Sequence, residues 1–477
     1  MRANSVSVLP RADMQAPQEP NAAFVAPTKR AAATIFWLLT AINFLNYLDR
    51  IVFVAVGPEL KHSFHLDDGQ VGMTASAFLL VYTLAALPMG LMADRRSRTK
   101  IIAVGVALWS LATWYTAIAH TFTELFVGRA VLGIGEASYI PAGAALLAAY
   151  FPRGERAQVL SRWGASTLVG TAVGFVAGGV IAQHFGWRLA FLLCGPPGLI
   201  LAYLIWRAKD RQAYDADDLA AKTEVLAPPP APRARNAPAW QHTLRTLAGQ
   251  VQTVLQSRTV RISILLQALG LLVTTPALVF VPIYLREHFH LSIESTALIA
   301  GGVLIPAGVL GTLLGGVVAD RLTRRYPGGR MMAVGIGFAG AAPFFIAAFL
   351  SSNLYVLLGL AFIGVGFLNM YNGPLNAAIQ DVVPSTLRAS AIAVIMTIAH
   401  LLGDVGSPTF VGKLAGWLPT HNVAYALVIC GGPALVIAAL LAVVATRVYT
   451  RELSHQGHPQ EACDGDKPTP HAYAPVG

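Results

Sequence analysis

An arginine and a glutamate interrupt the apolar stretch GRAVLGIGEASYIPAG at positions 128–143. Arg129 and Glu136 are seven residues apart, close to two helical turns, so a helix would place both side chains on one face. Arginine keeps its charge and binds a phosphate or a carboxylate with a planar fork. A carboxyl group in an apolar environment favours its neutral form and can bind and release a proton. This stretch can therefore hold an anion and carry a proton.

Two other apolar stretches also contain charged residues. NYLDR supplies Asp49 and Arg50, and HLLGDVGSP supplies His400 and Asp404. An ionisable group at the centre of a membrane helix costs about 2.5–3.5 kcal/mol, so it normally faces a cavity or a partner and marks a transport pathway. We therefore treat these stretches as candidate functional sites.

The first hypothesis assigns separate roles to the carboxylates and the arginines. Glu136 and Asp49 are the expected proton carriers, and Arg129 or Arg50 would anchor an anionic head group or a carboxylate. The alternative is that Asp49 with Arg50, and Arg129 with Glu136, form static ion pairs that fix helix packing. The other candidate substrate contacts are Tyr139, Asn46, His400 and Asp404.

His400 and Asp404 also have a purely structural interpretation. They are four residues apart, so on one helix they can form a hydrogen bond to each other. Such a bond would stabilise a helix bend before Pro408 without any contact with a substrate.

The composition indicates what positions these residues. Hydrophobic residues make up 55% of the 477 positions and charged residues only 12%. Continuous charge-free runs of about 20 residues predict membrane-spanning helices and exclude a β-barrel, whose strands alternate. We predict an all-α protein with twelve spans. The expected helices are 31–57, 70–92, 100–120, 122–149, 158–184, 187–207, 260–285, 294–319, 329–350, 354–380, 387–414 and 421–446.

Basic residues are distributed unevenly between the loops. Only four of the 34 lysines and arginines lie in odd-numbered loops: Lys61, Arg188, Arg286 and Lys413. The positive-inside rule then predicts that both termini are cytoplasmic. The net charge of +10 is explained by this topology, and we expect no nucleic-acid partner.

A sequence repeat divides the chain in two. GLMADRRSRTK follows the second predicted span and GVVADRLTRRY follows the eighth. The expected divisions are a disordered tail at 1–30, a six-helix half at 31–207, a linker at 208–258, a second half at 259–447 and a disordered tail at 448–477. We expect the charged residues of both loops to act as a conformational gate. They are Asp94, Arg95, Arg98, Asp320, Arg321 and Arg324.

The paired loops resemble the signature of the major facilitator superfamily, G-x-L-A-D-R-x-G-R-K, although Ser97 and Thr323 stand where the motif has glycine. This resemblance implies alternating access between two halves, with the first and fourth helices lining a central cavity. GIGEASYIPAG, HLLGDVGSP and NYLDR together resemble the Spinster family. That resemblance implies a lysophospholipid or sphingosine-1-phosphate as cargo, and proton coupling as in some members. Aromatic residues could supply an apolar wall for the lipid chain: Phe53, Phe78, Phe280, Tyr284, Phe367 and Tyr371.

We therefore expect a proton-coupled transporter of an amphiphilic anion, monomeric and in a bacterial inner membrane. A proton-coupled symporter of a small organic anion is the alternative, and a non-transporting membrane receptor is the second. The sequence contains no nucleophile–base pair, metal-binding set or phosphate loop, so we expect neither an enzyme nor a metal or cofactor beyond the proton gradient.

Overall fold

The computed structural model describes residues 27–211, 214, 249, 251–383 and 388–455, and every regular element in these ranges is helical. Within the described residues, twelve segments are long and apolar enough to cross a membrane, as expected. Most of the expected tails and most of the expected linker lie outside the described residues, but residues 448–455, expected to belong to the disordered C-terminal tail, form the end of α18. The helices are α1 (Lys29–Ala55), α2 (Gly57–Ser63), α3 (Asp68–Arg95), α4 (Arg98–Ala117), α5 (Phe122–Ala137), α6 (Tyr139–Tyr150), α7 (Arg153–Phe185), α8 (Trp187–Arg207), α11 (Arg258–Phe289), α12 (Ile293–Thr323), α13 (Gly329–Leu350), α14 (Leu354–Asn369), α15 (Asn372–Val382), α16 (Arg388–Gly403), α17 (Ser407–Trp417) and α18 (Val423–His455).

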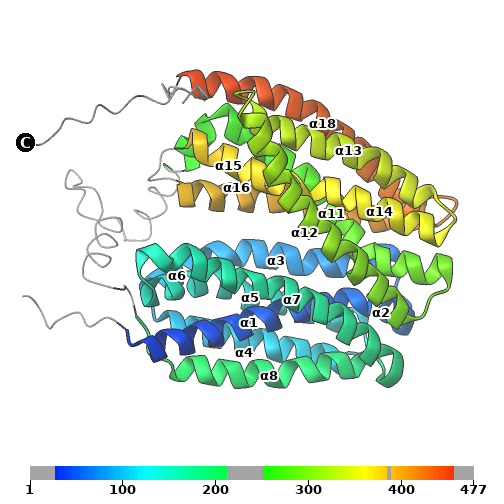
Figure 1. The fold of residues 1–477 in the computed structure, drawn as a ribbon. Helices are drawn as coiled ribbons and strands as arrows, with labels where there is room; N and C mark the ends of the chain where they lie inside the picture. The colour runs from blue at the N-terminus through cyan, green and yellow to red at the C-terminus, as the bar shows by residue number, and fades with distance from the viewer. Residues whose placement is uncertain (1–26, 212–213, 215–248, 250, 384–387, 456–477) are drawn as a thin grey trace, which may run out of the picture.

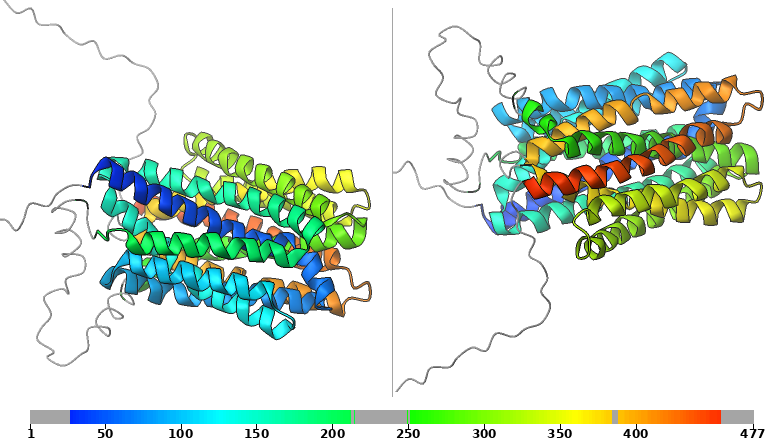
Figure 2. Two further views of the ribbon diagram at one scale, coloured as in Figure 1. Left: turned by 90° about the horizontal axis from the view of Figure 1, so that it is seen from below. Right: turned by 90° about the horizontal axis from the view of Figure 1, so that it is seen from above.

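The helices form two bundles that lie side by side (Figure 1). We call α1–α8 the N-half and α11–α18 the C-half. Their long axes run in roughly the same direction (Figure 2). α1 begins and α18 ends at the same end of the molecule, which we call the terminus end. The short helix α2 lies at the opposite end, which we call the α2 end (Figure 1).

In the described residues, three spans each consist of two helices, which meet at the α5–α6, α14–α15 and α16–α17 junctions. Each break lies about four residues before a proline: Pro141, Pro374 and Pro408. Proline has no N–H for the carbonyl four residues earlier, and its ring crowds that carbonyl, so a helix bends or ends there. The expected helices 122–149 and 354–380 are therefore each divided, and the bend expected before Pro408 is confirmed.

Side-chain caps fix where several helices begin. The Asp67 side chain accepts a hydrogen bond from the Gln70 backbone N–H at the start of α3, and the Gln70 side chain bonds back to the Asp67 N–H. Thr121 and Glu124 form the same reciprocal cap on α5. Each cap satisfies backbone donors that a helix N-terminus leaves free, so α5 starts in a defined register ahead of Glu136.

Glycines allow close helix contacts where the halves meet. A Cβ atom on Gly72 of α3 would lie 2.2 Å from the carbonyl oxygen of Pro408 in α17, so no larger residue fits at this crossing. The hydroxyls of Ser76 and Thr409 hydrogen-bond across the same seam at 2.8 Å. A second seam joins α7 to α12. These two seams connect the N-half to the C-half.

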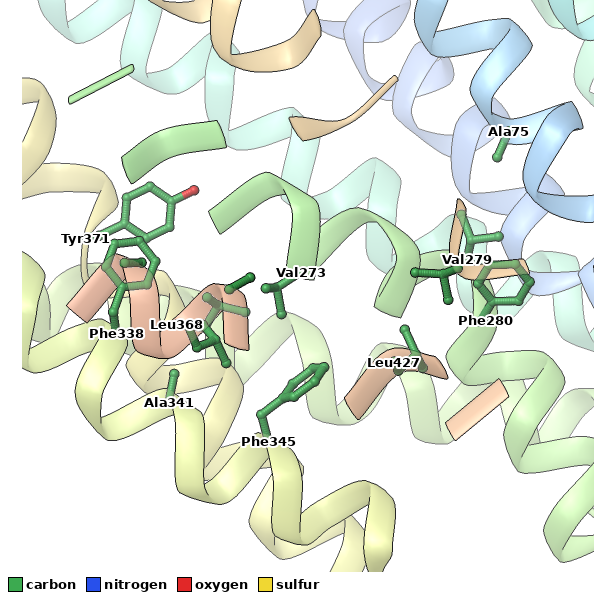
Figure 3. Close-up of a cluster of buried hydrophobic side chains, with 14 of the residues drawn as sticks. Ala75, Val273, Val279, Phe280, Phe338, Ala341, Phe345, Leu368, Tyr371 and Leu427 are labelled. Atoms are coloured by element: carbon green, nitrogen blue, oxygen red, sulfur yellow. The ribbon is translucent and has the colours of Figure 1, made fainter. Parts of the chain in front are cut away.

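A buried apolar core runs through the C-half. Phe338 of α13 and Tyr371 stack with ring centroids 5.0 Å apart, and Figure 3 shows Val273, Phe345 and Leu368 in the same cluster.

Candidate functional site

Arg50 and Glu136 form an ion pair inside the N-half. The Arg50 Nε of α1 donates to the Glu136 Oε2 of α5 at 2.5 Å, and the Glu136 side chain is fully buried. The pairing differs from both static pairs considered from the sequence, Asp49 with Arg50 and Arg129 with Glu136. The bond therefore ties the first span to the fourth instead of closing within one helix.

Arg129 is buried and lies against aromatic rings. Its guanidinium carbon is 4.1 Å from the centre of the Phe53 ring and 4.8 Å from that of Phe78, distances at which a cation is attracted to the ring face. Arg129 forms no ion pair with any described residue, and its Nε has no hydrogen-bond partner among them. Arg50 lies over the same Phe78 ring at 5.1 Å, so the two guanidinium groups share one aromatic side chain.

Asp49 completes the cluster. It is buried, and its Oδ2 accepts a hydrogen bond of 3.0 Å from the Thr113 hydroxyl of α4. Asn46, one turn earlier on α1, is also fully buried. Asp49 lies within electrostatic range of both Glu136 and Arg129. The structure thus brings together all four charges that the sequence suggested for the first and fourth spans, although it pairs them differently.

Tyr139 lies just beyond the break that follows Glu136. Its hydroxyl donates to the Leu39 carbonyl oxygen at 2.5 Å and accepts from Trp163 Nε1 at 2.8 Å, and the residue is fully buried. These bonds fix the start of α6 against α1 and α7. A contact between Tyr139 and substrate stays a prediction.

His400 on α16 and Asp404, one residue past the end of that helix, form the expected contact with each other. The second carboxylate oxygen of Asp404 accepts a hydrogen bond from the Thr275 hydroxyl of α11. Asp404 is buried and precedes the break before α17. The group therefore joins two helices at a break, and its contact with substrate also stays a prediction.

A large apolar pocket lies between α7 of the N-half and the C-half. Its volume is about 530 Å³, and its walls come from α7, α11, α12, α13 and α14. Phe175, Val303, Phe345 and Leu368 are typical lining residues, and Thr274 and Asn369 are among the few polar ones. A pocket of this size and composition fits an aliphatic chain.

The expected aromatic wall is only partly found at this pocket. Tyr284 lines it. Phe53 and Phe78 lie instead against Arg129, and Phe367 stacks on Phe344. Helical periodicity does not reveal which face of a mostly apolar membrane helix meets a cavity, which is why the sequence did not locate the pocket.

Ion pairs join the two halves at the α2 end. Lys61 Nζ lies 2.6 Å from the carboxylates of both Asp68 and Glu287, and Arg286 lies 2.8 Å from Glu59. Burial alone would lower the pKa of the Lys61 ammonium, but the Asp68 and Glu287 carboxylates outweigh it and raise that pKa above its ordinary value. We call these five residues the α2-end latch.

One more polar contact joins the two halves besides the α2-end latch. His184 of α7 and Glu294 of α12 lie 3.2 Å apart, also across the two halves. Among the described residues, the hydrogen bonds and ion pairs that cross between the halves lie at or toward the α2 end. The sequence does not predict the α2-end latch, although Lys61 and Arg286 are two of the few basic residues in odd-numbered loops.

The repeated loops lie at the terminus end. Arg98 donates to the Ala145 carbonyl oxygen of α6 at 3.0 Å. The side chains of Asp94 and Arg95 lie outside the described residues. The three gate candidates in the second loop are exposed and form no ion pair with described residues: Asp320, Arg321 and Arg324. Their role as a gate stays a prediction.

Arg330, not Arg324, is the structural counterpart of Arg98. Arg98 donates to a carbonyl oxygen 47 residues further along the chain, and Arg330 does the same in α15. Arg330 also pairs with Asp381. More residues separate α12 from α13 than separate α3 from α4. Aligning the two loops by their motif alone therefore pairs Arg98 with Arg324 instead of Arg330.

Known proteins are similar to this chain in sequence and in fold. The sequence pattern that defines the Major Facilitator Superfamily matches residues 39–408. Protein spinster homolog 1 of Xenopus tropicalis is 26% identical over 428 residues, which cover 84% of this chain and 78% of the relative. The human protein spinster homolog 1 is 28% identical over 404 residues, covering 80% of this chain and 73% of the relative. The sphingosine-1-phosphate transporter SPNS2 of Xenopus tropicalis is 24% identical over 466 residues, covering 91% and 85%.

A solved structure has the same overall arrangement. The crystal structure of a bacterial homolog of the human lysosomal transporter Spinster, in an inward-facing and unoccupied conformation, matches with a TM-score of 0.70 and 21% identity. The match covers 90% of this chain and 98% of that one. The chain therefore belongs to the Major Facilitator Superfamily, a family of transporters and not of enzymes, and is related to the Spinster proteins.

Proposed function

We propose that this transporter moves a single-chain anionic amphiphile, such as a lysophospholipid or a sphingoid phosphate, in a proton-coupled cycle. The observation that carries the proposal is a pair of unlike sites. The N-half holds a buried cluster of two arginines and two carboxylates, and the pocket against the C-half is almost wholly apolar. A molecule with an anionic head and an aliphatic tail suits both.

Arg129 is the first anchor for the anionic head. It is buried and forms no ion pair with a described residue, so a phosphate would supply a paired negative charge and accept from its Nε. Phe53 and Phe78 hold the guanidinium plane in place before any ligand arrives. Such preorganisation reduces the conformational entropy that binding costs.

The Arg50–Glu136 pair supplies the coupling. While Glu136 is ionised it occupies Arg50, and once Glu136 takes up a proton the ion pair is lost and Arg50 can bind the cargo. Proton and cargo then bind together, and cargo affinity rises as pH falls. Asp49, within electrostatic range of Glu136, is the second proton carrier.

The apolar pocket accepts the tail. Its volume of about 530 Å³ lies within the usual range for sites that bury a small ligand, and its polar groups are few. Each buried methylene contributes about 0.8 kcal/mol, so a long chain contributes much of the binding free energy. In this scheme His400 and Asp404, with Asn46 and Tyr139, contact or position the head group.

The latch implies the orientation of the cycle. The contacts between the halves lie toward the α2 end, so the cargo enters and leaves from the terminus end in this state. The positive-inside rule makes that end cytoplasmic, and the state is then inward-facing, as in the bacterial homolog. We place the protein, as a monomer, in a bacterial inner membrane. The loop residues of both repeats, with Asp94 and Asp320 as examples, close the terminus end in the opposite state.

A second candidate function is proton-coupled symport of a small organic anion. The charged cluster alone favours it, because Arg50 and Arg129 would bind a short carboxylate as well as a phosphate. The apolar pocket would then have no role, so we rank symport of a small organic anion second.

Reconstituted vesicles test the proposal. Uptake of a labelled lysophospholipid is measured with and without a pH gradient, with unlabelled lysolipid, sphingoid phosphate or short carboxylates as competitors. We expect lysolipid uptake to follow the gradient and only the amphiphiles to compete. Displacement by short carboxylates but not by amphiphiles would establish the second candidate instead.

A further inference from the structure

We propose that a second lipid site lies at the terminus end of the N-half, separate from the cargo pathway, and that it binds the phosphodiester head group of an anionic phospholipid from the adjacent leaflet. The site is a cavity of about 450 Å³ between the start of α1, the end of α6 and the start of α7. None of its lining residues belongs to the Arg50–Glu136 cluster or to the apolar pocket.

Aromatic rings form much of the cavity wall. The Phe36 ring meets the Phe151 ring edge-on at 6.4 Å, and the Tyr150 hydroxyl is held by the Lys209 carbonyl oxygen at 2.6 Å. Trp37, edge-on to Phe36 at 5.2 Å, leaves 66% of its surface exposed. Exposed tryptophan at the end of a membrane span is typical of the boundary between lipid tails and head groups. The cavity therefore lies at the depth of phospholipid head groups.

Two cations line this cavity without partners. Lys29 on α1 and Arg162 on α7 are exposed, and neither forms an ion pair or a side-chain hydrogen bond with any described residue. Glu155 is the one carboxylate among the lining residues, and it lies in the first turn of α7, where it stabilises the helix N-terminus. The lining charge is net positive, which complements a phosphodiester.

The opposite end of the molecule provides a contrast. There the basic residues Lys61 and Arg286 are neutralised by carboxylates of the protein itself. No described residue neutralises Lys29 or Arg162 in this way. α1 and α7 also both begin at this cavity, so the positive ends of two helix dipoles add to the two side chains. Basic pockets between spans are sites where anionic lipid head groups bind.

Lipid retention tests the site without any transport step, so the result is independent of the proposed cargo. The full-length protein is purified in detergent, supplied with dioleoyl phosphatidylglycerol or dioleoyl phosphatidylcholine, and analysed by native mass spectrometry. We expect preferential retention of phosphatidylglycerol. The double variant Lys29→Gln/Arg162→Gln should weaken it about 30-fold, or about fivefold for each charge removed. Lys29→Arg should retain it.

A matched control removes the same charge from the same end of the molecule. Lys100 and Arg207 are exposed, lie at the terminus end and lie outside the cavity. Lys100→Gln/Arg207→Gln should leave retention within about twofold of wild type, since any long-range effect is screened. An equal loss in both double variants would show that only the general surface charge attracts the lipid, and would overturn the proposal.

A variant with unchanged charge tests the cavity itself. Ala33 lines it and is exposed, so Ala33→Trp fills the cavity without disturbing the core. We expect this variant to lose phosphatidylglycerol retention while its melting temperature stays that of wild type. Unchanged retention in Ala33→Trp, or displacement of the lipid by millimolar inorganic phosphate alone, would overturn a phospholipid site here.

Discussion

Arg50 on α1 reaches across to Glu136 on α5, whereas Arg129, on the same helix as Glu136, does not pair with it. One buried carboxylate thus pairs with one of two neighbouring arginines, while the other forms no ion pair with a described residue and lies against aromatic rings. The cluster is asymmetric before any cargo binds. Its single ion pair is the contact that protonation can break.

The first prediction concerns stability and its dependence on pH. Arg50→Ala leaves the ionised Glu136 buried without its ion-pair partner and should lower the free energy of unfolding by about 3–5 kcal/mol. The loss should shrink at acid pH, because protonated Glu136 needs no cation. Thermal unfolding across a pH series measures it. Arg50→Met/Glu136→Gln should regain most of the stability but not transport, and Arg30→Ala, at the exposed start of α1, should change neither. A pH-independent loss in Arg50→Ala would contradict the pairing.

The second prediction concerns coupling. If one proton accompanies each cargo molecule, a gradient of one pH unit contributes about 1.4 kcal/mol and drives about tenfold accumulation. In Glu136→Gln the accumulation should disappear while cargo still equilibrates across the membrane. Vesicle uptake at several gradients measures it. Glu155→Gln, an exposed carboxylate outside the cluster, is the control and should accumulate cargo normally. Normal accumulation by a folded Glu136→Gln protein would remove Glu136 from the mechanism.

The third prediction concerns the tail. Shortening the cargo chain by two methylenes removes about 1.6 kcal/mol of apolar burial and should weaken apparent affinity about 15-fold. Val303→Phe narrows the apolar pocket and should shift the preference to shorter chains. The matched control is Val317→Phe on the same helix, where the side chain is exposed and outside the pocket. Competition by a series of lysolipids of increasing length measures both. An affinity independent of chain length would leave the pocket without a role.

The fourth prediction concerns the α2-end latch. Arg286→Glu places two carboxylates opposite each other, since Glu59 lies 2.8 Å from the native guanidinium. This partly exposed pair should contribute about 1 kcal/mol, so the population open at the α2 end should rise about fivefold. Distances between spin labels placed across that end report the shift. The swapped pair Glu59→Arg/Arg286→Glu should restore the closed population. If the swap and the single variant open equally, the ion pair does not hold the latch.

Much of the fold could be predicted from hydropathy and composition, because lipid forces every span to satisfy its own backbone. The number of spans and the gathering of four charges from the first and fourth spans are confirmed. The identity of the ion pair could not be predicted, since it depends on how α1 is rotated against α5. The rotation of α1 is constrained where it packs against α7, for example at Gly170 of α7, where an added Cβ would lie 2.4 Å from the Phe44 carbonyl oxygen.

The helix breaks show a different limit. Pro141, Pro374 and Pro408 all lie in expected spans, yet the sequence predicts a bend only before Pro408. A membrane helix often tolerates proline with a mere kink, so the residue alone does not determine whether the helix divides. The correspondence of Arg98 with Arg330 needed the structure as well, because the loops between their helices differ in length.

The fourth span of each half is divided into two helices, but the residues around the two breaks differ in chemistry. One adjoins Glu136 and the charged cluster, and the other adjoins Asn369 at the wall of the apolar pocket. The same kind of break therefore lies beside charged residues in the N-half and beside an apolar pocket in the C-half. A molecule that binds the charged cluster and the apolar pocket at once must have two chemically different ends. The difference between the two halves therefore selects against cargo with two identical ends.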